Sequence, residues 1–217
     1  MVELLICNQQ VVGSSPIASS KPHIKMYRIF GCPIYEEILH LSDNEEHAIK
    51  NEINKIGFRS PKDWLCSVDT TFENDNQLHL SPVFSSLASK LNDHAINFAR
   101  NLNFKLSSFK LKIHDMWCNR YTKYQSQEKH SHGRHFLSCA YFFSAPENSA
   151  PLIFFNPTHE AIINFPTEHD INLHAFSVTP EKGKILIFPG WLEHGVKLNK
   201  TEEPRITFSC NWNIVDG

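Results

Sequence analysis

The sequence lacks any long apolar run, any C-x-x-C pair of cysteines and any marked excess of charge of one sign. No window approaches the roughly 18 apolar residues that a membrane-spanning helix needs. No basic segment followed by an apolar one opens the chain as in a signal peptide. The net charge of −2 argues against non-specific binding to nucleic acid, which depends on clustered positive charge. These absences predict a cytoplasmic protein with no membrane partner and no non-specific nucleic-acid binding.

The six cysteines are scattered rather than grouped at the spacings of a disulfide framework. Such a pattern suits reduced thiols in the cytosol. By contrast, hydrophobic residues make up 41% of the chain and 16 residues are Phe, which is ample for a packed core. The 217 residues fit one domain, or one domain with a helical elaboration.

The first 25 residues differ from a normal domain start. The segment Val11–Ser20 resembles the peptide obtained when the 3′ half of a transfer-RNA gene is translated in frame. We therefore expect residues 1–25 to be a spurious or flexible N-terminal extension, with Met26 as the true initiator or with an ordinary mobile tail as the alternative. Residues 26–217 are expected to form a single domain.

Two helices are predicted in the first half of that domain. Ser42 is a good N-cap, and Glu45 three residues later completes a capping box before a charged helix over 46–56. Gly57 is well placed to end that helix. A second helix is expected to begin near Pro82, which is acceptable in a first turn. It carries an apolar stripe at helical spacing, which predicts a helix packed on a sheet: Phe84, Leu87, Leu91, Ala95, Phe98 and Leu102.

After Asn103 the chain reads as strands, separated by turns that contain proline or glycine. The expected strands are Phe109–Asn119, His130–Phe143, Leu152–Phe155, Leu173–Val178, Lys184–Phe188 and Arg205–Trp212. Many short strands without intervening helices are typical of a double-sheet jelly roll. The sequence therefore predicts a mainly β protein with N-terminal helices, that is, a double-stranded β-helix braced by two helices.

Three histidines beside these strands suggest a metal site. His130 and His132 are two residues apart, so on an extended chain their side chains point to the same side. His194 follows a distant strand and can complete one face of a coordination sphere. Arg205 opens a later strand, and its guanidinium suits a dicarboxylic co-substrate because it can bind a carboxylate through two parallel hydrogen bonds.

As a set, these motifs resemble the 2-oxoglutarate/iron(II)-dependent dioxygenases, and most of all a small bacterial and phage group with an H-x-H…S-G-x-Y-Y signature. The likeness covers roughly residues 110 to 215 and is specific as a set, because order, spacing and strand context agree. The matching segments are His130–His132, Ser138–Tyr141, Leu152–Pro157, Gly183–Pro189, His194 and Arg205–Thr207.

The resemblance implies that His130, His132 and His194 bind Fe(II), while Arg205 and Thr207 hold the far carboxylate of 2-oxoglutarate. It further implies hydrogen bonds to that co-substrate from Tyr141 and Asn119, with a core aromatic whose hydroxyl reaches a polar partner as the equal alternative for Tyr141. The expected reaction consumes O2, releases succinate and CO2, and hydroxylates an unidentified small-molecule or peptidyl substrate. The protein is expected in the cytoplasm of a bacterium or of a phage-infected host cell. Whether it forms a homodimer is left open.

The sequence departs from the class at His132, where most such dioxygenases have Asp or Glu. Glu128 and Asp115 are the runner-up iron ligands, Glu193 would point away, and none of the three is favoured. His135 is five residues from His130 and is expected to face the opposite side. The remaining histidines of this region are interpreted as structural: His114, His159, His169 and His174.

Two rival functions come from other classes. One is a non-catalytic jelly-roll module, for binding or as part of a virion, with vestigial histidines. The other is a cupin-like dioxygenase that uses three histidines and no 2-oxo acid. The Arg205-x-Thr207 pair argues against the second, because it has no obvious role without a dicarboxylate.

Overall fold

The computed structural model describes residues 31–157 and 174–217. The chain divides into two compact units, Met1–Ile34 and Tyr35–Gly217, and the fold described below is that of the second. In the first unit only residues 31–34 are described, and they form no helix or strand. The predicted extension over residues 1–25 lies outside the described residues and stays a prediction.

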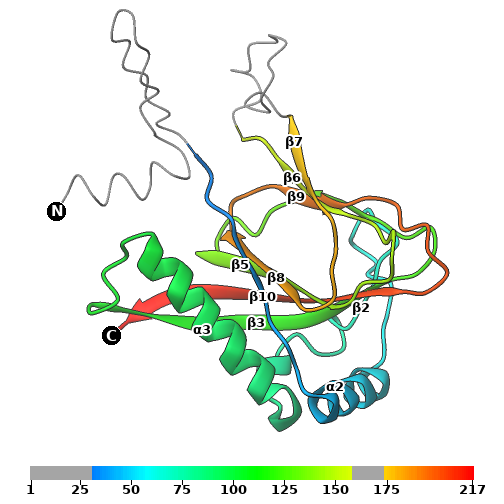
Figure 1. Cartoon of the computed structure of the whole chain (residues 1–217), viewed down its shortest axis with the longest axis horizontal. Helices are drawn as coiled ribbons and strands as arrows, with labels where there is room; N and C mark the ends of the chain where they lie inside the picture. Colours follow the sequence, from blue (N-terminus) through cyan, green and yellow to red (C-terminus); the bar gives the residue numbers. More distant parts are fainter. Residues whose placement is uncertain (1–30, 158–173) are drawn as a thin grey trace, which may run out of the picture. The chain divides into compact units, whose positions relative to one another are not determined.

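Two antiparallel sheets form the core of Tyr35–Gly217 (Figure 1). The larger sheet has the strand order β1 (Tyr35–Ile38), β8 (Lys184–Pro189), β5 (Leu137–Ser144), β10 (Arg205–Asp216), β3 (Phe109–Tyr121) and β2 (Asp69–Thr70). The smaller sheet has the order β4 (Gln127–His130), β9 (His194–Val196), β6 (Leu152–Phe155) and β7 (Ala175–Val178). From β3 to β10 the chain crosses repeatedly between the two sheets, with only β6 and β7 among the described strands consecutive in one sheet, which confirms the predicted jelly roll.

Both predicted helices are present. Helix α2 (Asp43–Ile56) begins with the predicted capping box, because the Glu45 backbone N–H donates to Ser42 Oγ and the Ser42 N–H donates to the Glu45 carboxylate at 2.7 Å. Gly57 follows it with φ +76°, a conformation that favours glycine. Two short 3-10 turns, Leu78–Leu80 and Pro82–Phe84, precede helix α3 (Ser85–Asn101). Within the described residues no helix is long and apolar enough to cross a membrane.

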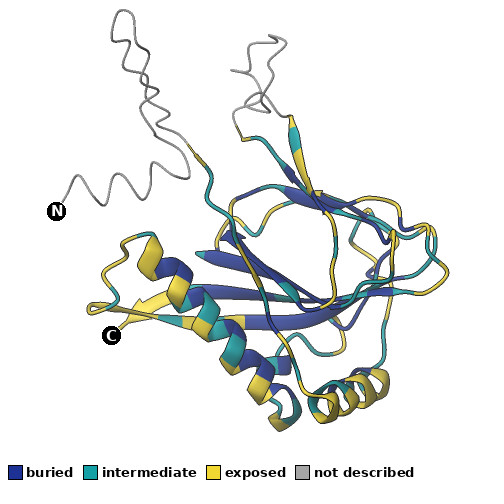
Figure 2. Cartoon of the chain, in the orientation of Figure 1, coloured by how far each residue is buried: buried dark blue, intermediate teal, exposed yellow. Residues whose placement is uncertain are grey.

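The helices cover the outer face of the larger sheet (Figure 1), and their buried sides face it (Figure 2). The apolar stripe of α3 packs against alternate residues of β10, β5 and β8. Residues from these strands in this core include Phe208, Cys210, Trp212, Tyr141, Phe143, Ile185 and Ile187. Because strand side chains alternate, the other residues of the same strands face the second sheet.

The prediction of one continuous strand over His130–Phe143 is wrong. The segment His130–Phe143 is two strands in different sheets, β4 ending at His130 and β5 starting at Leu137. Between them the chain makes a tight turn, in which the His135 N–H donates to the His132 carbonyl at 2.8 Å. The chain can thereby cross from one sheet to the other, a change of direction that strand periodicity does not encode.

Candidate active site

The site is built on the inner face of β10 and β3. Alternate residues of β10, from its first residue onward, face the space between the sheets, and each pairs with an inward residue of β3. The four cross-strand pairs are Arg205 with Tyr121, Thr207 with Asn119, Ser209 with Trp117 and Asn211 with Asp115. This polar stripe lines a cavity of about 570 Å³ between the sheets, a size typical of small-ligand sites.

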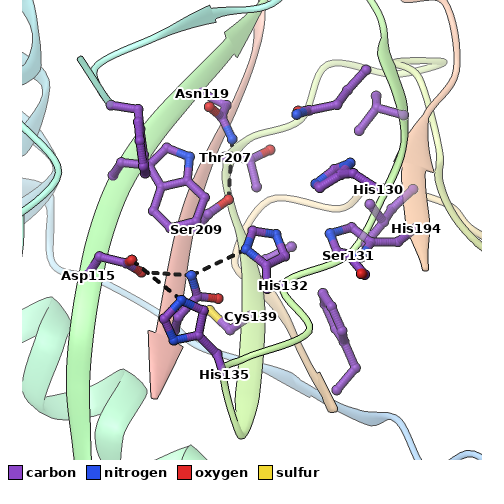
Figure 3. Close-up of a pocket in the computed structure, with 18 of the residues that line it drawn as sticks. Asp115, Asn119, His130, Ser131, His132, His135, Cys139, His194, Thr207 and Ser209 are labelled. Atoms are coloured by element: carbon purple, nitrogen blue, oxygen red, sulfur yellow. Dashed lines mark hydrogen bonds and ion pairs between the residues drawn. The ribbon is translucent and has the colours of Figure 1, made fainter. Parts of the chain in front are cut away.

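The three predicted histidines line the same cavity and point toward one another (Figure 3). His130 ends β4 and pairs directly with His194, the first residue of β9. His132 lies in the loop just after β4. Although the strand has ended, the ring of His132 still lies next to that of His130. The ring centroids are 4.3 Å apart for His130 and His194 and 5.2 Å apart for His132 and His194. One ligand nitrogen from each ring lies within 4.8 Å of the other two, close enough to share a metal ion.

Two of the rings are oriented by backbone carbonyls. The Nδ1 atoms of His130 and His194 lie 2.9 Å from the Glu128 carbonyl and 2.8 Å from the Leu192 carbonyl. A carbonyl can only accept, so each Nδ1 carries the proton and each Nε2 keeps its lone pair. Burial lowers the pKa of both imidazoles, that of His194 well below its usual value. Both rings are therefore neutral at pH 7, the form that binds metals.

The third ring, His132, has a side-chain partner. The Asn211 amide nitrogen lies 3.3 Å from His132 Nδ1 and also donates to Asp115 Oδ1 at 2.7 Å. The other end of this amide accepts a hydrogen bond from the Ser138 hydroxyl at 2.6 Å. Burial, with help from the nearby His130 and His135, lowers the pKa of His132 to about 3. The orientation of this ring thus depends on Asn211.

Arg205 is a buried cation, with 1% of its surface exposed. Its Nε donates to Thr207 Oγ1 at 3.2 Å, and Nη1 donates to the Ala150 carbonyl at 2.7 Å. The guanidinium also lies over the rings of Tyr121 and Phe142, at 4.9 and 4.7 Å from their centroids. Burial lowers its pKa to about 10, so it remains charged at pH 7. Among the described residues, no carboxylate forms an ion pair with it.

Thr207 and Asn119, the other two residues predicted to contact the co-substrate, lie side by side in the cavity wall. Thr207 accepts from Arg205, which leaves its hydroxyl proton free to donate. The Asn119 amide donates to Ser209 Oγ at 3.3 Å, whereas its Oδ1 is buried without a hydrogen-bond partner. Trp117 Nε1 and Glu128 Oε2, in the lining of the same cavity, are also buried without one. Buried polar atoms without partners are rare and point to a missing ligand or water.

Tyr141 does not line the cavity, and the prediction that it contacts the co-substrate is wrong. It belongs to the core between sheet and helices, and its hydroxyl donates to the Leu39 carbonyl at 3.3 Å. Strand β5 is buried on both faces, so its sequence does not reveal which residues face inward. The tyrosine in the cavity is Tyr121, which donates to Gln127 Oε1 at 2.7 Å. Tyr121 lies opposite Arg205 on the neighbouring strand, a pairing that depends on strand register and is not visible in the sequence.

None of the runner-up carboxylates belongs to the histidine triad. Glu193 points away as expected and pairs with Lys129 at 2.7 Å. Glu128 and Asp115 line the cavity, but Asp115 is separated from His132 by the Asn211 amide. His135 also lies outside the triad, next to Asp115 and His114.

Comparisons with known proteins give one family match and a shared fold. Residues 115–211 match the family model described as "Putative 2OG-Fe(II) oxygenase". No curated protein sequence matches the chain.

Solved structures share the fold at low sequence identity. A prolyl-4-hydroxylase from Pseudomonas putida is 10% identical, with a TM-score of 0.59 over 84% of this chain and 92% of that one. HygX from Streptomyces hygroscopicus, solved with nickel, 2-oxoglutarate and hygromycin B, is 14% identical, with a TM-score of 0.59 over 84% and 83%. The viral collagen prolyl hydroxylase of Paramecium Bursaria Chlorella virus-1, solved with 2-oxoglutarate, is 15% identical, with a TM-score of 0.54 over 82% and 94%.

The family match begins at Asp115 and ends at Asn211, and so contains the histidine triad, Arg205 and Thr207. Through this segment, the chain is similar to the 2-oxoglutarate/iron(II) oxygenases.

Proposed function

We propose that this protein is an oxygenase that binds Fe(II) through His130, His132 and His194 and hydroxylates its substrate with 2-oxoglutarate and O2, releasing succinate and CO2. The residues present fit the metal. Three neutral imidazoles converge with their ligand nitrogens within 4.8 Å of one another, and imidazole suits Fe(II). They would occupy one face of the ion and leave the remaining positions open to the cavity.

The observation that carries the proposal is the burial of the positively charged Arg205 side chain. A buried, unpaired cation costs several kcal/mol, an effect that a bound carboxylate offsets. Its guanidinium lines the same cavity as the triad, and the Thr207 hydroxyl beside it can donate a further hydrogen bond. A molecule with one end at the histidines and a carboxylate at Arg205 is a short dicarboxylate, as 2-oxoglutarate is. A cupin-like enzyme without a 2-oxo acid would leave this cation unexplained.

When bound, Fe(II) and 2-oxoglutarate supply the oxidising chemistry, and the chain supplies position and environment. Arg205 and Thr207 fix the far end of the co-substrate, which sets the reach of its other end toward the histidines. The carbonyls of Glu128 and Leu192 hold His130 and His194 in the ligating tautomer. Apolar side chains beside the triad, Leu152, Phe188 and Val196, limit the entry of water.

The substrate class is a small molecule or a peptidyl group, as expected from the sequence. The structural neighbours span both, since HygX was solved with hygromycin B bound and two others are prolyl hydroxylases. We further propose that the protein is cytoplasmic and forms a homodimer.

The decisive test is an anaerobic titration of the Fe(II)-reconstituted protein with 2-oxoglutarate, monitored by the weak visible charge-transfer band of the chelate. We expect the band in the wild type and its loss in His132→Ala and His194→Ala. Arg205→Met keeps the side-chain volume but removes the charge. It should weaken 2-oxoglutarate binding about tenfold or more, because a charge-assisted hydrogen bond contributes about 1.5–3 kcal/mol.

His47→Ala, at an exposed position of α2, is the matched control and should behave like the wild type. Iron binding without the band would indicate the cupin-like enzyme. Absence of iron binding would indicate a non-catalytic jelly-roll module.

A further inference from the structure

A second group of metal-ligating side chains lies outside the triad. His114, Asp115 and His135 each offer one ligand atom, and the three atoms lie within 4.8 Å of one another. Figure 3 shows Asp115 and His135 side by side. The Asn211 amide nitrogen contacts both Asp115 and His132 and so lies between the two groups. We propose that these three residues bind a second divalent cation of the zinc type.

A β-bulge brings two of these ligands together. Asn211 pairs with Asp115 and Trp212 pairs with Ile113, so His114 has no partner residue on β10. Neighbouring residues of a regular strand point to opposite faces, whereas a bulge redirects one of them. His114 Nδ1 consequently lies 3.1 Å from Asp115 Oδ2.

His135 faces the same carboxylate oxygen from the turn before β5. Its Nδ1 lies 3.0 Å from Asn213 Oδ1, an acceptor, so Nδ1 carries the proton and Nε2 presents a lone pair. That lone pair faces Asp115 Oδ2 at 3.9 Å, too far for a hydrogen bond. Two atoms that each lie about 2.0–2.2 Å from the same tetrahedral zinc ion are separated from each other by a distance similar to the 3.1 and 3.9 Å found here. Donation of the other ring N–H to an oxygen is also what metal-binding histidines usually show.

The carboxylate is held in place for this role. Asp115 is 5% exposed, and its Oδ1 accepts from Asn211 at 2.7 Å, which turns Oδ2 toward the two imidazoles. The His114 side chain is 46% exposed, so one side of the group is open to water. Two imidazoles, one carboxylate and an open position form a familiar zinc ligand set.

The bound cation would fasten the loop that carries His132. His114 and Asp115 belong to β3, whereas His135 belongs to the turn after β4, and its N–H donates to the His132 carbonyl at 2.8 Å. A metal ion between them therefore joins the sheet to the loop that presents one ligand of the triad. The inference concerns zinc binding alone and does not depend on the proposed reaction.

The test uses Zn²⁺ alone, added to the metal-free full chain, with bound metal measured by equilibrium dialysis and metal analysis. The wild type should bind one equivalent at the triad and a second at His114, Asp115 and His135. His194→Ala should keep the second equivalent. Adding His114→Ala to that variant should weaken the remaining zinc about tenfold or more, which is about 1.4 kcal/mol. His114 is partly exposed, so this change should leave the fold intact, and His135→Ala should have the same effect on zinc.

Thermal unfolding supplies a second measurement. Zinc should raise the midpoint of His194→Ala and should no longer do so once His114→Ala is added, because only the folded site binds it. His47→Ala, an exposed histidine outside the group, should change neither result. The inference is overturned if His194→Ala retains no zinc, if His114→Ala leaves zinc affinity unchanged, or if His47→Ala weakens it equally.

Discussion

Asn211 connects two groups of ligand side chains through one amide. Its nitrogen donates to Asp115 and lies against His132, while its oxygen accepts from Ser138. Arg205, six residues earlier on the same face of β10, is a cation whose described partners are a hydroxyl, a carbonyl and two rings. At the residue scale, the site therefore consists of buried polar groups whose remaining bonding capacity is directed at ligands.

Replacing Asn211 by Ala should weaken the iron site without removing a ligand. Loss of a partner that orients a metal-binding histidine costs about 10- to 100-fold in metal affinity or activity. The intensity of the 2-oxoglutarate charge-transfer band at limiting Fe(II) measures this, because a second metal site does not contribute to it. Urea unfolding should also show a loss of about 1–3 kcal/mol, since buried Asp115 and Ser138 lose a partner. Ser209→Ala, on the same stripe, is the control, and an unchanged band in Asn211→Ala would contradict the role of Asn211.

The loop over residues 131–136 is the element that assembles the triad, because it carries the chain from β4 to β5. It packs against the turn after β8, where the His132 N–H donates to the Gly190 carbonyl at 2.7 Å and the Gly190 N–H donates to the Phe136 carbonyl. The approach is so close that a Cβ at Gly190 would lie 2.2 Å from the His135 carbonyl oxygen and 3.0 Å from that of His132. Only glycine fits at this position.

Gly190→Ala should therefore displace the loop and with it His132. We expect loss of the charge-transfer band and a decrease of about 1–3 kcal/mol in the free energy of unfolding, the usual cost of overpacking. Gly133→Ala, in the loop itself, provides a matched control, because the atom nearest to its Cβ would be Ser131 Oγ at 3.9 Å. Equal behaviour of the two variants would show that close packing at Gly190 does not hold the loop.

At the scale of the whole molecule, the two sheets enclose three imidazoles that are neutral in the folded state. Burial lowers the pKa of His130 and His194, and the pKa of His132 falls to about 3. In the unfolded chain each has its ordinary pKa of about 6.5. The unfolded state therefore binds more protons as the pH falls, and protonation favours unfolding.

The metal-free protein should accordingly lose stability below about pH 6.5, whereas this contribution is fully present above it. Between pH 7.5 and 5.0, His132 alone should lower the free energy of unfolding by on the order of 1–2 kcal/mol. Denaturant titrations in the presence of a chelator measure the change, and His132→Gln should show a flatter dependence. A free energy of unfolding that is constant or rises toward pH 5.0 would contradict the prediction.

Local signals in the sequence predicted several elements correctly. The capping box at Ser42 and Glu45 depends only on residues three apart, and it is present at the start of α2. The apolar stripe of α3 is likewise local, and it predicted which face of this helix is buried. Arg205 and Thr207 share a face because they are two residues apart on one strand.

Other features depend on which segments meet. The two faces of β5 are both apolar, so only its pairing with β8 and β10 puts Tyr141 in the core and leaves Tyr121 in the cavity. His114 was interpreted as structural because the sequence shows no pattern of partner residues around it, whereas the bulge opposite β10 brings it against Asp115.

The sequence by itself determined the fold class, the helix boundaries near α2 and the histidines and arginine that line the cavity, because periods of 2 and 3.6 residues and short spacings are local properties of a chain. Only the tertiary structure decided how His132 is oriented through Asn211, which tyrosine faces the cavity, and that His114, Asp115 and His135 come together. Those arrangements follow from strand register, a bulge and a change of sheet, which arise when distant segments pack against each other.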